Sequence, residues 1–408
     1  MKFDTKNLLY VEEVQKGYIT IEQADQLIQT GSGLSFIDNG QKSKLLGQVG
    51  DVSALVKVVS NTGISNYSML SAEKSKLEKL IRLPYAPDMI FDHTPGHVFS
   101  GHSLNDHLYA YLSREFGKEV VVATAPVMVA FDQKTGIEIN HLLEVIEHMA
   151  EVGVKFMLFH PTTSYDTWAV AEKERIVPST SWTGSLLYRD MLMNHRRENI
   201  VAEHFEEILR ILKKYNVTCD IGTTFRPARI KETLDTAHRK ELQEQNYWIS
   251  KTKEMGVFCI REGIGHICLD KVNEFAELIG NDTPIMPLPV STDFSVGFDH
   301  VSCAVALTAI GMKCNIGLIN PVTDKEHTGG VPNYDDIHVG LKTARVVAHS
   351  LNLMHIRGVR AYDDSLAESR QRNQTCVIQG GLFENMSQNL DDIGNCNRCG
   401  NCPLKNNL

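Results

Sequence analysis

Short apolar segments recur along the chain, and amphipathic patterns separate them. The apolar segments predict strands at 55–59, 89–91, 120–129, 155–159, 217–220, 257–260, 285–290 and 314–319. Apolar residues spaced three or four positions apart predict helices at 139–152, 202–215, 239–255, 272–279 and 335–353. Strands that alternate with helices indicate a parallel sheet. Eight such units favour an α/β fold of the (β/α)8 TIM-barrel type over a doubly wound sheet.

The pattern changes at both ends of this barrel. Residues 1–50 form a helix-rich preface with an apolar, hairpin-like segment at 34–37. After about residue 353 a polar stretch at 358–389 leads to a cluster of cysteines. We therefore expect a preface at 1–50, a barrel at 51–355 and a C-terminal tail carrying the cysteine cluster at 356–408. No G-x-G-x-x-G motif follows a predicted strand, so a dinucleotide-binding fold is unsupported.

Composition excludes several classes of protein. Of 408 residues, 42% are hydrophobic and 22% charged, which argues against a disordered chain. The net charge of −9 argues against binding nucleic acid through bulk charge. The most apolar run, 120–131, is too short for a membrane span, and the first ten residues lack a signal-peptide pattern. We expect a cytoplasmic protein.

The nine cysteines divide into two groups. Six are scattered among apolar neighbours and are typical of small buried side chains. The other three form Cys396-x-x-Cys399-x-x-Cys402, surrounded by turn-forming Gly, Asn and Pro. Such a triplet can hold three irons of a [4Fe–4S] cluster and leave one iron open, or hold zinc with a fourth ligand. An unligated tail is the third possibility.

Polar side chains follow nearly every predicted strand, where the catalytic loops of a barrel converge. They are Asn61, Asp92, His93, His160, Ser181, Ser185, Arg226, Glu262, His266, Asp293, Asp299, His300, Glu326 and His327. A single residue of this kind is usually a helix cap or turn former, but imidazole is rare as a cap and common as a metal ligand. In the segment REGIGH, two glycines would let the backbone turn sharply and aim His266 into the barrel mouth. Another histidine cluster, His93, His97 and His102, is compatible with simple surface polarity.

Ordered motifs then reveal a resemblance. Residues 262–266 (EGIGH) resemble EGPGH, and 292–300 (TDFSVGFDH) resemble TDIAPGYDH of the ThiC family of radical S-adenosylmethionine enzymes. Residues 325–336 resemble KEHLGLPNKDD, 342–349 resemble YKIAAH, and 363–370 resemble DDALSKAR of the same family. Members are phosphomethylpyrimidine synthases, which convert aminoimidazole ribotide into the pyrimidine of thiamin.

The resemblance implies cofactors and roles for matched residues. Cys396, Cys399 and Cys402 would bind the [4Fe–4S] cluster, whose open iron binds S-adenosylmethionine and cleaves it reductively. His266 and His327 would hold a divalent metal, zinc or iron, in the barrel mouth. Substrate would be held by Asn61, His160, Ser181, Arg226 and Glu262. We assign catalytic roles to Glu262, Asp293 and His300, with Glu262 as an acid/base or substrate anchor.

The resemblance also implies partners. The cluster tail of this family commonly reaches over the active site of a dimer partner, so we expect a homodimer. Reductive cleavage needs an electron donor such as a flavodoxin or ferredoxin.

Several departures fall on the ribotide-binding motifs. The family's SRGG loop, which grips the ribotide phosphate, reads Ser181-Trp-Thr-Gly184, and its GDGLRP reads GTTFRP at 222–227. Arginine clamps phosphate with charged, forked donors, whereas Trp182 offers one neutral donor. The family's C-terminal motif C-x2-C-x4-C is shortened to C-x2-C-x2-C in this sequence.

We therefore expect a radical rearrangement or carbon–carbon lyase step in the biosynthesis of a heterocyclic cofactor, on a small substrate other than aminoimidazole ribotide. Alternatives are phosphomethylpyrimidine synthase itself, a hydroxybenzimidazole synthase, a protein of guanylylpyridinol cofactor biosynthesis, or a non-enzymatic iron–sulfur assembly or carrier protein.

Overall fold

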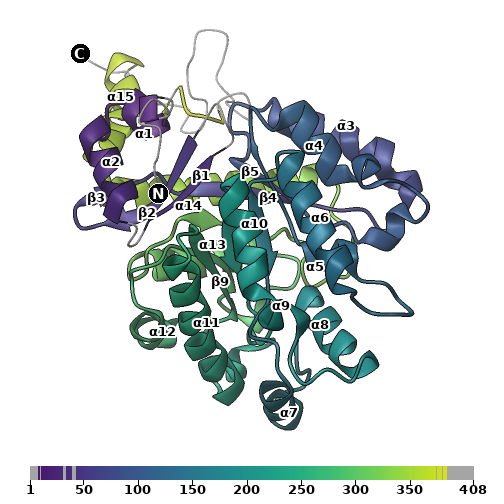
Figure 1. Cartoon of the computed structure of the whole chain (residues 1–408). Helices are drawn as coiled ribbons and strands as arrows, with labels where there is room; N and C mark the ends of the chain where they lie inside the picture. The colour runs from purple at the N-terminus through teal and green to yellow at the C-terminus, as the bar shows by residue number, and fades with distance from the viewer. Residues whose placement is uncertain are drawn as a thin grey trace, which may run out of the picture.

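A barrel of parallel strands forms the centre of the computed structural model (Figure 1), which describes residues 8–9, 11–30, 34–38, 43–373, 375–378 and 380–383. Within these residues eight strands pair in the order β10-β9-β8-β7-β6-β5-β4-β11. They are β4 (Lys57–Thr62), β5 (Met89–Asp92), β6 (Val121–Thr124), β7 (Phe156–Phe159), β8 (Thr218–Ile221), β9 (Cys259–His266), β10 (Ile285–Val290) and β11 (Leu318–Ile319). The predicted (β/α)8 class is confirmed.

The ring closes between β10 and the residues just before β11. Ile285 bridges Ile316 in the parallel sense, and the Ile285 N–H donates to the Asn315 carbonyl over 2.8 Å. The Gly317 N–H donates back to the Ile285 carbonyl over 3.0 Å. A closed parallel barrel has no free edge, so its interior is a packed core and chemistry is confined to the strand ends.

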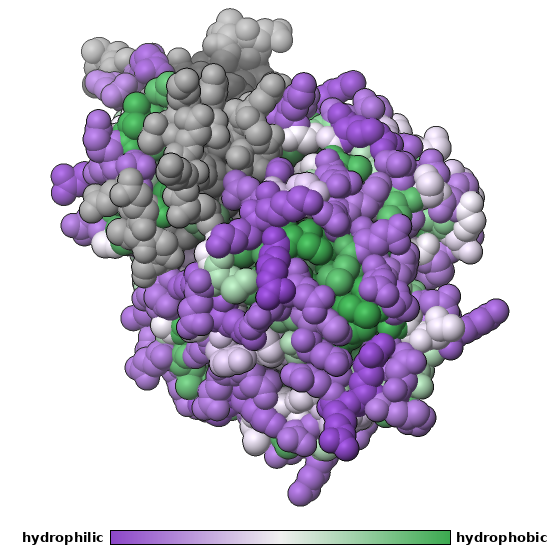
Figure 2. All heavy atoms as spheres, viewed as in Figure 1, coloured by the Kyte–Doolittle hydropathy of each residue, from purple (hydrophilic) through white to green (hydrophobic). Residues whose placement is uncertain are grey.

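Helices cover the outside of the barrel. They are α3 (Leu70–Ile81), α4 (Leu108–Phe116), α5 (Pro126–Ala130), α6 (Ile139–Glu151), α7 (Tyr165–Glu174), α8 (Trp182–Met193), α9 (Ile200–Glu203), α10 (Phe205–Tyr215), α11 (Thr236–Glu254), α12 (Val272–Ile279), α13 (Asp299–Gly311) and α14 (Tyr334–His355). Figure 2 shows one largely hydrophilic face, on which apolar side chains are visible mainly where α10 lies beside α6. No helix in the described parts of the chain is long and apolar enough to cross a membrane.

The N-terminal segment closes the end of the barrel at which the strands begin. It contains α1 (Glu12–Gln15), α2 (Ile21–Thr30), β1 (Leu34–Asp38), β2 (Ser43–Val49) and β3 (Val52–Ser53). The predicted hairpin is confirmed, because β1 and β2 pair in the antiparallel sense. Lys57, at the start of β4, forms a buried ion pair with Glu13 of α1. The preface thus covers the barrel end opposite the expected active site.

Three predicted strand boundaries were wrong. The run 120–129 is β6 followed by the short helix α5, because Pro126 at its first position lacks an N–H and already has a helical φ. The run 257–260 belongs to a longer strand, β9, which continues to His266. REGIGH is therefore extended rather than sharply turned, although Gly265 has φ +80° and packs against the Pro227 carbonyl. The run 314–319 is strand only at Leu318–Ile319.

The polar stretch after the barrel is not a loose tether at its start. It begins with α15 (Arg357–Asn373), a 17-residue helix. Gly358 of this helix lies against the Tyr18 ring, and Val359 and Ile356 pack with Leu55. Figure 1 accordingly shows α15 beside α1 and α2. The domain boundaries at 50 and 355 stay predictions, and the three cluster cysteines lie outside the described residues.

Candidate active site

Two histidines from different loops meet at the barrel mouth. His266 ends β9, and its Nε2 lies 3.3 Å from the Nε2 of His327, which follows β11. The Nδ1 of His266 lies 2.5 Å from Asp293 Oδ1, and that of His327 lies 3.0 Å from Asp299 Oδ1. Each ring is thus oriented by a carboxylate so that its second nitrogen faces the other ring.

The two aspartates come from one segment but from different elements. Asp293 starts a 3-10 turn, Asp293–Ser295, and accepts the Ile230 N–H. Asp299 is fully buried at the start of α13 and also accepts the Ser295 hydroxyl, 2.9 Å away. The Nδ1 of His300, the next residue, is buried without a hydrogen-bond partner among the described residues. The predicted single loop is therefore a turn followed by a helix.

Glu262 lies in the middle of β9 rather than at a strand end, and its side chain is 6% exposed. Its Oε2 accepts the Thr223 N–H over 3.0 Å, and its Oε1 lies 3.9 Å from Arg226 Nη1. Burial raises the pKa of Glu262, and the Arg226 guanidinium opposes this shift. A carboxyl group under such opposed influences is a candidate for proton transfer.

The loop after β8 is organised by a residue that the sequence did not single out. Glu241 of α11 is fully buried and accepts the N–H groups of Thr224 and Phe225 at 2.6 and 2.7 Å. The hydroxyls of Thr223 and Thr162 also donate to it, at 2.6 and 2.8 Å. This loop carries the N–H that binds Glu262, and Arg226 follows it directly. The only sequence signal was a polar residue at a helix position that faces the barrel.

His160 is held in a tight space at the end of β7. Its Nδ1 lies 3.1 Å from the Thr224 hydroxyl, and the ring is 1% exposed. Burial first, and then Arg226, lowers the pKa of His160 to about 3, so the imidazole is neutral. A Cβ at Gly222 would lie 2.6 Å from His160 Nε2, so glycine is required for this placement.

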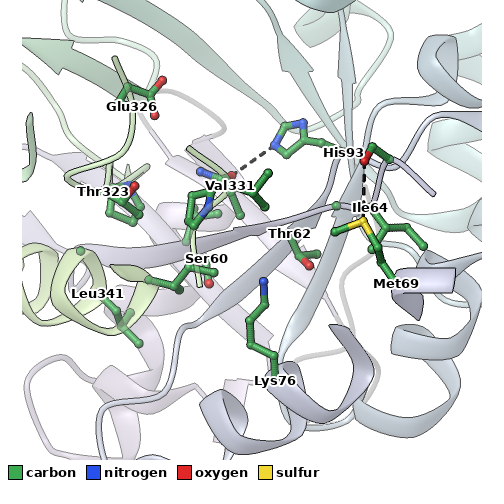
Figure 3. A pocket seen from close by; sticks show the side chains of 18 of the residues that line it. Ser60, Thr62, Ile64, Met69, Lys76, His93, Thr323, Glu326, Val331 and Leu341 are labelled. Carbon is green, nitrogen blue, oxygen red and sulfur yellow. Dashed lines mark hydrogen bonds between the residues drawn. The ribbon is translucent and has the colours of Figure 1, made fainter. Parts of the chain in front are cut away.

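A cavity of about 350 Å³ opens beside Asn61 at the end of β4 (Figure 3). The side-chain amide of Asn61 donates from Nδ2 to Asn320 Oδ1 over 2.6 Å, and the Oδ1 of Asn61 lies 3.2 Å from His93 Nε2. Burial lowers the pKa of His93 to about 4, and the ring stacks on Phe91. His93 and Asn320 thus belong to this site, although nothing set them apart from other polar residues that follow strands.

Most of the cavity lining is apolar. It includes Ile64, Met69, Trp182, Val331, Ile337 and Leu341. Figure 3 shows Lys76 directed toward it from α3, but the Lys76 Nζ lies 2.8 Å from Glu73. Trp182 is half exposed. The cavity therefore suits a largely apolar group.

Ser181 serves the protein's own backbone. Its hydroxyl accepts the Gly184 N–H over 3.1 Å and caps α8. Arg226 is likewise engaged, because its Nε and Nη2 donate to the hydroxyl and carbonyl of Thr180. The structure thus brings most of the predicted residues to one end of the barrel in three groups: the histidine pair, the Glu262–Arg226–His160 group, and Asn61 beside His93.

Comparison with known proteins identifies the family. The sequence profile of the radical SAM ThiC family matches residues 5–406. The chain belongs to the radical SAM ThiC family. Phosphomethylpyrimidine synthase of Campylobacter jejuni subsp. jejuni is 28% identical over 306 residues, 71% of this chain and 70% of that protein. The enzyme of the same name from Clostridium tetani is 30% identical over 275 residues, 64% and 60% of the two chains.

Membership in the ThiC family determines the class of chemistry. The protein is a radical S-adenosylmethionine enzyme with a [4Fe–4S] cluster, a small-molecule substrate and a reductant. Among solved structures, dihydropteroate synthase from Coxiella burnetii matches with a TM-score of 0.43 and 10% identity, over 78% of this chain and 99% of that one. The match is too weak to add anything about the site.

Proposed function

We propose that this ThiC-family enzyme acts on a small heteroaromatic substrate other than aminoimidazole ribotide, in the biosynthesis of a heterocyclic cofactor. The main observation in support of this proposal is that the basic groups near the cavity are already paired. Lys76 is bound to Glu73, and Arg226 faces Glu262 and Thr180. Among the described residues, a phosphate dianion buried here would find no uncompensated cation, and burying such a charge unpaired is costly.

The N-terminus of α8 supports the same proposal. Free N–H groups at a helix N-terminus are a ready binding site for phosphate. Here the Ser181 hydroxyl already accepts the Gly184 N–H, and the adjoining Trp182 lines the apolar cavity. We infer that Trp182 packs on the substrate ring while Asn61 and His160 contact its polar edge.

The histidine pair fits a divalent metal, zinc or iron. If each Nδ1–H donates to its aspartate, both Nε2 lone pairs face each other, which is unfavourable unless a cation lies between them. Two nitrogens bonded to one tetrahedral ion at about 2.0–2.1 Å are about 3.3 Å apart, which equals the separation here. The described residues offer no group of three metal-binding side chains, so water or substrate would complete the coordination.

Glu262 is the proposed acid/base of the reaction, and Asp293 is proposed to orient His266 rather than to react. A catalytic role for His300 stays a prediction. When bound, the cluster would supply the electron that cleaves S-adenosylmethionine, with a flavodoxin or ferredoxin as its source. Exposed Phe294 and Phe298 next to the histidine pair support a homodimer in which this loop is covered.

The experiment is anaerobic reconstitution of the full chain, reduction, and measurement of 5'-deoxyadenosine. Its formation would support the enzyme, whereas its absence under every reducing condition would favour a carrier protein. Aminoimidazole ribotide is then added as a probe. No binding and no conversion to the thiamin pyrimidine is the expected result, and tight binding or turnover would overturn the altered-substrate proposal.

A further inference from the structure

Asp220 of β8 is a fully buried acid whose carboxyl group has no hydrogen-bond partner among the described residues. Its side chain is 0% exposed. Other buried carboxylates among the described residues have at least one satisfied oxygen. Asp88, for example, pairs with Lys44 and Arg345 and accepts the Val58 N–H. An unpartnered buried carboxyl in a native fold requires an explanation.

The strand register places Asp220 next to Glu262 inside the barrel. Asp220 lies opposite Ile260 across the β8–β9 pair, and Glu262 is two residues farther along β9. Side chains two positions apart share a face of the strand, so Ile260 and Glu262 point the same way as Asp220. The preceding residue, Cys219, contacts Thr252 of the outer helix α11, which leaves Asp220 directed inward. Glu262 is the member nearer the mouth.

The two acids have opposite surroundings. Glu262 has the Thr223 N–H at 3.0 Å and the Arg226 guanidinium at 3.9 Å. The residues opposite Asp220 are Leu158 on β7 and Ile260 on β9, both apolar. Burial, and then the charge of Glu262, raises the pKa of Asp220 well above its usual value.

The other titratable groups near Asp220 are thiols. Those of Cys219 and Cys259 have pKa values raised by burial, to about 12 for Cys259, and are neutral. A negative charge near neutral pH therefore belongs on Glu262, and the proton belongs on Asp220.

We propose that Asp220 and Glu262 form one acid pair that holds a single exchangeable proton, with Asp220 as its resting position. Pairs of acids whose surroundings separate their proton affinities divide the roles of acid and base between them. The O–H bond of neutral Asp220 breaks as a new O–H bond forms on ionised Glu262, directly or through a bridging water, and Glu262 then donates this proton to the substrate. A proton that the substrate later releases returns to Glu262 and from there to Asp220, which resets the pair. This inference rests on Glu262 being the acid/base of the proposed function.

Infrared spectroscopy of the full-length protein tests the pair directly, because the carbonyl stretch of a protonated carboxyl is separate from carboxylate bands and shifts in D2O. We expect a protonated-carboxyl band that persists in the wild type at a pH where ordinary carboxyl groups are ionised and that is absent in Asp220→Asn. Asp92 and Glu244, whose pKa values are raised to about 7 by burial, lose their bands at lower pH. The conservative Asn keeps the shape of the side chain, so the fold is retained.

The variant Glu262→Gln tests whether the charge of Glu262 affects the titration of Asp220. Without the neighbouring charge, the Asp220 band should titrate at least about one pH unit lower than in the wild type. No persistent band in the wild type, or a band unchanged in either variant, would overturn the inference. Because this readout needs neither cluster nor substrate, it is separate from the deoxyadenosine assay. A pair without deoxyadenosine would refute only the proposed function, and deoxyadenosine without the band would refute only the pair.

Discussion

A Cβ at Gly222 would lie 2.6 Å from the Nε2 of His160, so the strand end after β8 approaches the imidazole as closely as a backbone can. Gly222→Ala should therefore displace the ring from Thr224 and lower the free energy of unfolding by about 1–3 kcal/mol. Urea denaturation of the full-length protein measures this loss.

Gly263 on the adjacent strand is the matched control. A Cβ there would meet nothing within 4 Å. Gly263→Ala should leave the unfolding midpoint within error of the wild type. Equal losses in the two variants would contradict the steric explanation for Gly222.

The histidine pair predicts a graded loss of metal affinity. His327→Ala should abolish binding of Zn²⁺ or Fe²⁺ to the barrel, because one ligand remains. Asp299→Asn keeps both ligands but weakens the orientation of His327, so affinity should fall about 10- to 100-fold. Equilibrium dialysis with metal analysis measures both effects.

His349 provides a control with similar geometry, because its Nε2 lies 2.5 Å from Asp363 without a second histidine. His349→Ala should bind as much metal in the barrel as the wild type. If His327→Ala also binds as the wild type does, the two Nε2 atoms do not form the site.

Glu241→Gln should loosen the loop after β8. An ionised carboxylate there accepts four hydrogen bonds, and bonds to charged groups each contribute about 1.5–3 kcal/mol. The amide cannot accept with both atoms, so we expect a loss of about 2–4 kcal/mol in unfolding free energy. Glu244 lies on the same helix but is partly exposed, so Glu244→Gln should change the free energy of unfolding little. Calorimetry of both variants measures the difference. The reverse order would refute the role of Glu241.

His238 makes stability depend on pH. Burial, and then Arg175, lowers its pKa to about 3 in the folded state, whereas in the unfolded chain the pKa is about 6.5. Between these values the unfolded state binds the extra proton, so stability is full above about pH 6.5 and falls by up to about 1.4 kcal/mol per unit as pH decreases toward 3.

His238→Gln should reduce that slope in urea titrations between about pH 4 and 6.5. Substitution of the exposed His141 serves as control and should leave the slope unchanged. A slope identical in His238→Gln and the wild type would show that His238 is not the group responsible.

The sequence predicted the barrel and most of its strands because alternating apolar segments and helical periods carry that information locally. It also singled out His266 and His327, because a histidine after a strand has few structural uses, and their role as metal ligands stays a prediction. It could not reveal Glu241 or Asp220. The importance of Glu241 comes from donors on two loops that only folding brings together, and Asp220 has the same sequence signature as an acid that caps a helix. Likewise, no local pattern separates the capping role of Ser181 from substrate binding.

The contact between Gly358 and Tyr18 ties the last long helix, α15, to the segment between α1 and α2. Cys396, Cys399 and Cys402 follow α15 in the sequence, and the start of α15 packs on the N-terminal segment. Deleting N-terminal residues would consequently disturb the packing of α15, the helix that precedes the three cysteines. The N-terminal segment and these cysteines are thus connected through α15, although the whole barrel separates them in the sequence.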